Sequence, residues 1–333
     1  MAHNNVSIFV AHVGCPNLCS FCNQHTISGN QSAPTVEEVR ATCLKAFNQI
    51  EDKSSTEIAF FGGSFTAIER SYMVALLDCV QEYIGKDGFL GVRISTRPDC
   101  ITSEILDILK EYHVTTIELG CQSMKDDVLS ANRRGHTAQD VYNSCELIKS
   151  YGFELGLQMM VGLYTSTILD EYYTMNEIIK LNPNTVRIYP TVVLKGTHLD
   201  GLRQSGEYNP YDLDTMVNIC ADFLTQFSKH NINVIKCGLH ASELVESEMT
   251  GGYYHPAFRE LCESRIYRNI IEKIIKENEN KSNNVYNVSV SSRYISMAIG
   301  QKKSNIVYFK DKGIIVSILG VDNLNKYDCI LDN

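Results

Sequence analysis

Strand-like apolar runs alternate with amphipathic helical stretches over the first 190 residues, and this alternation constrains the fold more than any other feature. The predicted strands cover residues 7–13, 57–61, 92–95, 116–120, 154–161 and 185–189. Predicted helices lie between them: one starts at residue 35 and includes residue 47, and the others cover 71–84, 103–112, 137–151 and 169–181. Consecutive strand–helix units form a parallel sheet with right-handed crossovers. Six units in a row favour a partly closed barrel over two stacked domains.

The first helix has the clearest local signals. Thr35 followed three residues later by Glu38 is a capping-box pattern, which marks the start of a helix. Val39, Leu44 and Phe47 recur near helical spacing and are predicted to face the core.

The remainder of the chain has a different pattern. It predicts helices at 211–230 and 256–275, a polar stretch at 276–284, strands at 234–236, 285–290 and 314–319, and two short helices around Gly300. The predicted fold class is therefore α/β: a partial (β/α)6 barrel, similar to a TIM barrel, over residues 1–237, and a small α+β domain over residues 238–333.

Composition excludes several classes of protein. The chain has no apolar run of transmembrane length and no secretory signal, so we expect a cytoplasmic protein with no membrane partner. Its net charge of −9 argues against a nucleic-acid-binding surface over the whole molecule, although a local basic patch is compatible with it. Twelve cysteines without a signal peptide indicate a reducing compartment and thiols rather than disulfides.

Cys15, Cys19 and Cys22 stand at C-x3-C-x2-C spacing in a loop directly after the first predicted strand. Three thiolates on one loop can hold three irons of a [4Fe–4S] cubane and leave the fourth iron open to a ligand. The alternative is a zinc site with His12 or His25 as a fourth ligand. The spacing favours the cluster, because zinc usually takes four protein ligands in a structural site.

The other cysteines are predicted to be structural. Cys43, Cys79, Cys145 and Cys220 fall within apolar helical patterns, where cysteine acts as a small hydrophobic residue. A second metal site could be imagined from Cys237, His240, His255 and Cys262, but their spacing is not that of ligand pairs, and packing is the preferred interpretation.

The loops that follow parallel strands share one end of a barrel. The cysteine loop follows the first strand, Gly62 and Gly63 follow the second, and Gln122 follows the fourth. We therefore expect these three segments to face one opening.

Seven stretches carry a resemblance to a known family: GCPNLCSFCN from Gly14, FGGSFTA from Phe61, STRPDC from Ser95, IELGCQ from Ile117, RGHT from Arg134, QMMVGL from Gln158 and RIYPTVVLKGT from Arg187. In this order they resemble the radical S-adenosylmethionine (SAM) superfamily, and in particular the radical-SAM domain of the Elongator catalytic subunit and its short bacterial relatives.

The resemblance implies two cofactors, a [4Fe–4S] cluster and SAM. In this family the open iron chelates the amino and carboxylate groups of SAM, one electron passes to the sulfonium, and a 5′-deoxyadenosyl radical abstracts hydrogen from the substrate. It also implies oxygen sensitivity and a small flavodoxin- or ferredoxin-like electron donor.

Residue roles follow from the same resemblance. Cys15, Cys19 and Cys22 would ligate the cluster. The SAM-binding set would be Phe21 near the adenine, Gly62 and Gly63 near the methionine moiety, Ser95 where relatives often have glutamate, Gln122 and Gln158 for ribose hydroxyls or substrate, and Arg134 for the methionine carboxylate. Gln122 and Gln158 could instead be satisfied buried amides, and the glycines an ordinary tight turn. Tyr189 and Lys195 are expected near the substrate.

The substrate is open at this point. The Elongator subunit also has an acetyltransferase domain and a basic N-terminal extension, for which this sequence shows no room, so no acetyltransferase activity is expected. Residues 298–306 resemble the loop of KH domains, which bind RNA, except that Lys303 replaces the second glycine; an exposed connector between helices is the alternative.

Three functions compete. The first is radical-SAM chemistry on tRNA or other RNA. The second is radical chemistry on a small molecule, as in coproporphyrinogen-oxidase-like relatives. The third is a non-enzymatic iron–sulfur protein that binds RNA or senses redox state; the SAM-pocket residues Gly62, Gly63 and Arg134 argue against it.

Overall fold

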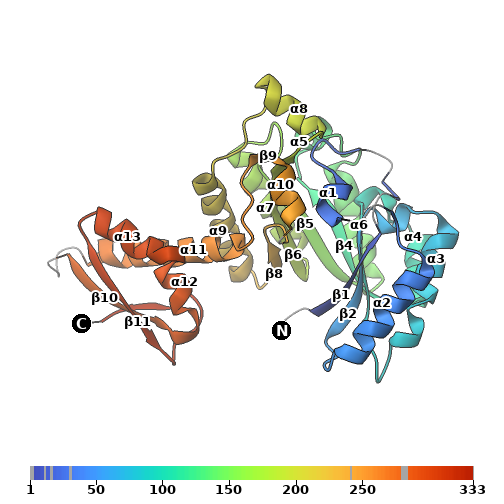
Figure 1. Cartoon of the computed structure of the whole chain (residues 1–333), viewed down its shortest axis with the longest axis horizontal. Helices are drawn as coiled ribbons and strands as arrows, with labels where there is room; N and C mark the ends of the chain where they lie inside the picture. The colour runs from blue at the N-terminus through green and yellow to red at the C-terminus, as the bar shows by residue number, and fades with distance from the viewer. Residues whose placement is uncertain are drawn as a thin grey trace.

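The computed structural model describes residues 4–10, 13–15, 18–29, 32–240, 242–278 and 284–332. A large α/β unit contains most of the chain, and a small α+β unit stands beside it at the C-terminal end (Figure 1). One long helix, α11 (Phe258–Glu277), leads from the first unit into the second.

A parallel sheet of seven strands, in the order β1-β2-β3-β4-β5-β6-β8, forms the centre of the large unit. Its strands are β1 (Asn4–Val10), β2 (Thr56–Gly62), β3 (Gly91–Thr96), β4 (Val114–Gln122), β5 (Glu154–Val161), β6 (Thr185–Pro190) and β8 (Asn233–Cys237). The prediction of an α/β partial barrel is confirmed. The barrel has one strand more than predicted, because β8 pairs in parallel with β6.

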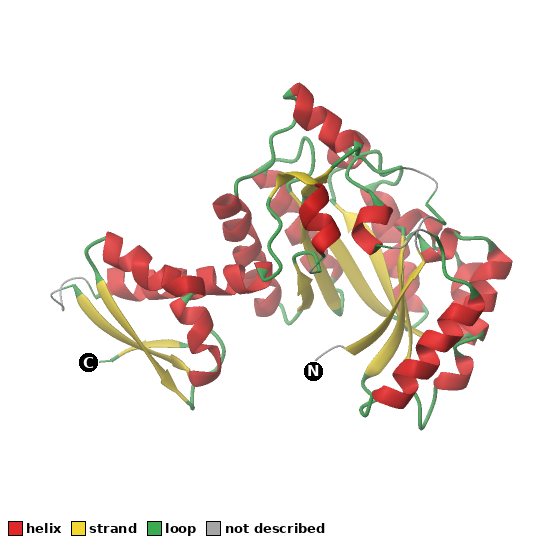
Figure 2. Cartoon of the chain, in the orientation of Figure 1, coloured by secondary structure: helices red, strands yellow, loops and turns green. Residues whose placement is uncertain are grey.

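Helices cover the outer face of this sheet (Figure 2). They are α2 (Val36–Gln49), α3 (Arg70–Asp78), α4 (Ser103–Glu111), α6 (Ala138–Ser150), α7 (Ile168–Leu181) and α9 (Leu213–Lys229). Side chains alternate along each strand, so Ile58 and Phe60 of β2 belong to the buried core. No helix in the described part of the chain is long and apolar enough to span a membrane.

Helix α2 begins as predicted. Thr35 and Glu38 form the capping box, and Val39 and Phe47 face the core. The prediction for Leu44 is wrong: its side chain is 51% exposed, because Cys43, one residue earlier, occupies the buried face. The predicted helix at 71–84 also ends early, at Asp78. The Gln81 side chain donates to the carbonyl of Leu77 (2.8 Å), which satisfies a group at the end of α3.

Short elements that were not predicted gather over the carboxyl ends of the parallel strands, which we call the barrel mouth (Figure 1). They are α1 (Gln24–Ser28), α5 (Asp126–Ala131), α8 (His198–Ser205), α10 (Glu243–Glu248), and the antiparallel pair β7 (Val192–Leu194) and β9 (Met249–Gly252). Ile27 of α1 packs against the same small cluster as Val245 of α10. Residues 243–252 thus contact other elements of the barrel mouth.

The small unit has a three-stranded sheet of β10 (Val285–Ser291), β11 (Ile315–Val321) and β12 (Cys329–Leu331), with α12 (Ile295–Ile299) and α13 (Ser304–Asp311) between β10 and β11. Helix α11 serves both cores: Phe258 and Cys262 pack in the barrel core, and Tyr267 and Ile271 pack in the small core. The domain boundary at 237/238 stays a prediction.

Candidate active site at the barrel mouth

The cysteine loop follows β1 at the barrel mouth. Cys15 is exposed, Cys22 is half-buried, and Cys19 is 7% exposed. The loop is anchored through Ser20, whose N–H donates to the Asn132 carbonyl (3.1 Å) and whose hydroxyl donates to the Asn132 side chain (2.7 Å). Asn132 is fully buried, so the loop is fastened to the segment that follows α5.

Arg134 connects this loop to the end of β4. Its Nη1 donates to the Cys19 Sγ (3.1 Å), and its Nη2 donates to the Gly120 carbonyl (2.6 Å). Only 7% of the side chain is exposed. The contact holds the Cys19 sulfur at a fixed place between the loop and the sheet. The prediction that Arg134 binds SAM remains a prediction, since two of its nitrogens already contact the protein.

The three thiols lie close enough to influence one another. Burial, and then the proximity of Cys19 and Cys15, raises the pKa of Cys22 to about 12, while Arg134 acts in the opposite direction. Within the ranges that the structure describes, no three His, Cys, Asp or Glu side chains converge as ligands of one metal ion. Thiolates of a cubane cluster bind different irons, so this donor set fits a cluster. His12 lies outside the described residues, and the His25 side chain is exposed.

The glycine turn after β2 lies against the cysteine loop. The Gly63 N–H donates to the Val10 carbonyl (3.0 Å), and a Cβ on Gly63 would lie 2.1 Å from the Val13 carbonyl oxygen. A Cβ on Gly14 would lie 2.3 Å from the Ser64 carbonyl oxygen. Gly62 has a φ of +114°, which only glycine adopts readily. These glycines are therefore required where the two loops meet, and their contact with SAM stays a prediction.

Two of the predicted polar residues meet inside the barrel. The Gln158 Nε2 donates to the Ser95 hydroxyl (3.1 Å) and to the Glu118 carboxylate (2.8 Å). Gln122, at the end of β4, has a φ of +64° and is 8% exposed. Its Oε1 has no hydrogen-bond partner among the described residues.

A buried ion chain inside the barrel was not predicted. Arg93 of β3 lies between the carboxylates of Glu57 (2.7 Å) and Glu118 (2.8 Å), and Arg187 of β6 binds Glu118 through two nitrogens (2.6 and 2.9 Å). Burial raises the pKa of Glu118, but Arg187 and then Arg93 outweigh burial, so the pKa falls and the carboxylate stays charged. The sequence signal that could have revealed this chain is the charged residue within each of these strands, because a buried charge requires a partner.

Arg97 and His136 were also missed. Both are almost fully buried, and the Arg97 Nη1, the His136 Nδ1 and the Arg134 Nε have no hydrogen-bond partner within the described ranges. Burial, followed by Arg134 and Arg97, lowers the pKa of His136 to about 4, so this imidazole is neutral at neutral pH. Each buried polar atom without a hydrogen-bond partner lowers the free energy of unfolding by roughly 1–3 kcal/mol. Together with Gln122, they mark a place beside Cys19 that suits a polar ligand.

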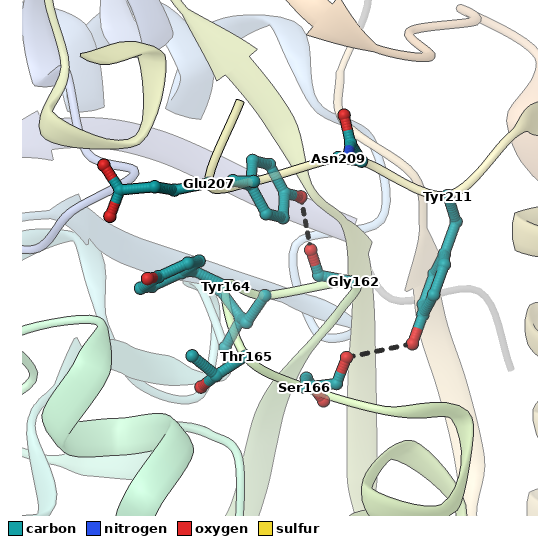
Figure 3. A pocket seen from close by; sticks show the side chains of 9 residues that line it. Gly162, Tyr164, Thr165, Ser166, Glu207, Asn209 and Tyr211 are labelled. Carbon is teal, nitrogen blue, oxygen red and sulfur yellow. Dashed lines mark hydrogen bonds between the residues drawn. The ribbon is translucent and has the colours of Figure 1, made fainter. Parts of the chain in front are cut away.

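The remaining predicted residues have different surroundings. Tyr189 is half-buried beside Arg187, whereas the Lys195 side chain is exposed in the turn after β7. Phe21 packs in a cluster with Tyr164 and Tyr208. These two tyrosines line a cavity of about 300 Å³, in which the Tyr211 hydroxyl donates to the Ser166 carbonyl (3.1 Å; Figure 3). The cavity therefore adjoins the cysteine loop through Phe21.

The predicted structural cysteines behave as expected. Cys43, Cys79, Cys145 and Cys220 are buried, and Cys237 and Cys262 lie in the barrel core.

Comparison with known proteins shows which family this chain resembles. The profile of the Radical SAM superfamily matches residues 10–178, and that of the Radical_SAM C-terminal domain matches residues 183–268. A tRNA uridine(34) acetyltransferase of Dehalococcoides mccartyi is 24% identical over 65% of this chain and 55% of its own length. The heme chaperone HemW of Bacillus subtilis is 24% identical over 72% of this chain and 64% of its own length.

Among solved structures, Elp3 of the archaeon Methanocaldococcus infernus matches with a TM-score of 0.62 and 20% identity, over 84% of this chain and 64% of that one. This likeness shows a shared fold. The chain spans little more than half of the acetyltransferase relative, so that protein's whole activity does not transfer with the match. The superfamily profile covers half of the sequence, and it matches the segment that contains the cysteine loop, the glycine turn and Arg134. The chain thus belongs to the radical SAM superfamily.

Proposed function

We propose that the chain is a radical-SAM enzyme that cleaves SAM reductively and acts on RNA, with tRNA as the first candidate. The observation that carries the proposal is the buried contact between Arg134 and Cys19, in a loop with two further cysteines. This contact fixes the Cys19 sulfur at the barrel mouth, next to several buried polar atoms that have no partner among the described residues.

In this proposal Cys15, Cys19 and Cys22 hold a [4Fe–4S] cluster, and the hydrogen bond from Arg134 holds the Cys19 sulfur in position. When bound, the cluster and SAM would together supply a 5′-deoxyadenosyl radical that takes a hydrogen atom from the substrate. The glycine turn holds the second loop against the cysteine loop, which limits how far the site can open to water.

The buried polar atoms at the barrel mouth and inside the barrel support proposed positions for SAM and for the substrate. Gln122, Arg97 and His136 have buried polar atoms without a hydrogen-bond partner among the described residues, and these atoms suit the charged and hydroxyl groups of SAM. The inward-facing residues Gln158, Arg187 and Tyr189 form the polar interior where the substrate would lie. A small flavodoxin- or ferredoxin-like protein would supply the electron.

RNA is proposed as substrate because one relative is named for tRNA uridine(34), and its match covers 65% of this chain. The proposal carries over only radical chemistry from that relative and not acetyl transfer, because the match spans 55% of its length. A small-molecule substrate is the alternative outcome of the test.

The test is anaerobic. The protein is reconstituted with iron and sulfide, reduced, and given SAM, and 5′-deoxyadenosine is measured with no addition, with bulk tRNA, and with coproporphyrinogen. We expect product that tRNA stimulates, and that is lost in Cys19→Ala. Cys43→Ala, which removes a buried thiol outside the loop, is the matched control and should retain product.

Two results would change the proposal. Stimulation by coproporphyrinogen but not by tRNA would replace the RNA substrate with a small molecule. A fully loaded cluster that yields no 5′-deoxyadenosine under any of the three conditions would contradict an enzymatic role, and would favour a chaperone or sensor.

A further inference from the structure

The helices α12 and α13 form a hairpin between the parallel strands β10 and β11 of the small unit. This β-α-α-β order places one tight turn, Gly300 to Lys303, at the tip of the hairpin. Figure 1 shows the two helices over the small sheet, on a unit that stands beside the barrel. In KH modules a turn between two such helices contacts the nucleic-acid backbone.

The turn directs two lysines outward at a conformational cost. Lys302 and Lys303 have φ values of +53° and +62°, and both side chains are exposed. A left-handed residue other than glycine costs roughly 1–2 kcal/mol, so this arrangement is not the default for lysine. The buried Asn305 holds the turn by donating to the carbonyls of Ser264 and Ala298 (both 2.9 Å).

The charge of this segment is opposite to that of the whole chain. Between residues 285 and 313 there are five basic residues and one acidic residue, which gives +4, in a chain of net charge −9. Lys303 is also the N-cap of α13, where the helix dipole favours a negative group. Two cations at this end repel the dipole, and a bound anion would relieve that repulsion.

A second cationic group lies one turn further along α13. The Arg268 guanidinium lies 4.2 Å and the Lys312 ammonium 4.3 Å from the centre of the Tyr308 ring. One carboxylate neutralises part of this charge: Glu272 pairs with Lys312 (2.6 Å) and accepts from the Tyr308 hydroxyl (3.0 Å). The Arg268 Nε is buried and has no hydrogen-bond partner in the part of the chain that is described. Cations interleaved with an aromatic ring are the elements that single-stranded nucleic acids require, for phosphates and for base stacking.

We propose that the α12–α13 hairpin binds the backbone of single-stranded RNA, with Lys302 and Lys303 on phosphates and the Arg268–Tyr308 pair further along the strand. The inference deepens the proposed function, since it concerns how an RNA substrate is held. It adds a binding surface separate from the barrel, so the two can fail independently.

The test measures binding of a fluorescein-labelled single-stranded RNA dodecamer to the cluster-loaded protein by anisotropy, over a range of salt concentrations. The variant is Lys302→Asn with Lys303→Asn, because asparagine tolerates left-handed φ values. The matched control is Lys45→Asn with Lys86→Asn, which removes two exposed lysines on the barrel side. A second variant, with glycine at 302 and 303, excludes strain as the cause.

We expect both turn variants to weaken binding about tenfold or more and to reduce the salt slope by about 1.4, at about 0.7 per phosphate contact. The control pair should bind as the wild type does. Equal affinity and slope in the turn variants would overturn the proposal, as would equal loss in the control pair. Binding of a polyglutamate peptide at this turn without binding of RNA would reassign the surface to a protein partner. The 5′-deoxyadenosine formed without added RNA reports on the barrel alone, so a failure of that activity is distinguishable from a failure of RNA binding at the hairpin.

Discussion

Arg134 is the residue on which the proposed site depends most. Its guanidinium contacts Cys19 and Gly120 from an almost fully buried position. A hydrogen bond to a charged group contributes roughly 1.5–3 kcal/mol, so Arg134→Gln should lower the rate of 5′-deoxyadenosine formation by about tenfold to a hundredfold. Thermal unfolding and iron content should be measured in the same samples. A fully loaded, folded variant with the wild-type rate would contradict the role given to Arg134.

Glu171 is a single residue that should make the stability of the protein depend on pH. Burial raises its pKa to about 7, although the Gly162 N–H donates to its carboxyl group (2.7 Å). In the unfolded chain this carboxyl group ionises near pH 4.3. The contribution of the neutral, buried group to the free energy of unfolding is therefore complete below pH 4.3, and it is lost as the pH rises towards 7. Over that window the wild type should lose about 3 kcal/mol relative to Glu171→Gln. Urea midpoints at pH 4.5 and 7.5 measure this, and a pH-independent difference between the two proteins would refute it.

The candidate site residues that the sequence indicated are those whose signal is local, and their roles stay predictions. Cys15, Cys19 and Cys22 have a distinctive spacing. Ser95 lies near the end of β3 and Gln158 lies within β5, and the two side chains are in contact. Arg97 and His136 were missed because their burial depends on how the loops after β3 and β4 pack, which no short motif contains. Glu118 was missed because its partners come from two other strands, β3 and β6, so their pairing depends on the order and register of the sheet.

At the scale of elements, the contact between the two loops at the barrel mouth is the critical junction. In Gly63→Ala the new Cβ would collide with the Val13 carbonyl and force the cysteine loop away from the turn after β2. We expect the iron content after reconstitution to fall to about half or less, with the barrel still folded, since overpacking typically costs 1–3 kcal/mol.

Gly201→Ala is the control for that variant, because nothing lies within 4 Å of a Cβ at this helical position. It should load iron as the wild type does. If both variants load fully by iron and sulfide analysis, the junction is not what holds the cysteine loop.

The ion chain ties four strands together. Arg93→Met would leave the carboxylates of Glu57 and Glu118 buried without this cation, which costs about 3–5 kcal/mol. Arg70→Met removes an exposed pair with Glu104 and should cost under about 1 kcal/mol. Urea unfolding of the two variants gives the comparison. Equal losses would mean that the interior chain is no more important than a surface pair.

The elements that the sequence predicted best are those with a long, regular hydrophobic period. The strand over residues 154–161 is found at the predicted bounds, and the Thr35 and Thr137 caps start helices as expected. The elements at the barrel mouth were missed because they are short. The pair β7 and β9 exists only through contact between distant segments, which a window of sequence cannot contain.

At the scale of the whole molecule, an acidic barrel carries a basic unit at one end. Helix α11 belongs to both cores, so the basic hairpin is held at a fixed place relative to the barrel. This arrangement joins a proposed site for radical chemistry to a proposed surface for RNA, in one chain of net charge −9.

The most direct test of the central claim is the electron paramagnetic resonance spectrum of the reduced, reconstituted protein, recorded with and without SAM. Three cysteine ligands leave one iron open, so SAM should bind that iron and change the spectrum of a [4Fe–4S]⁺ cluster. The same change should be absent in Cys19→Ala and present in Cys43→Ala. A fully formed cluster whose spectrum SAM leaves unaltered would contradict the account.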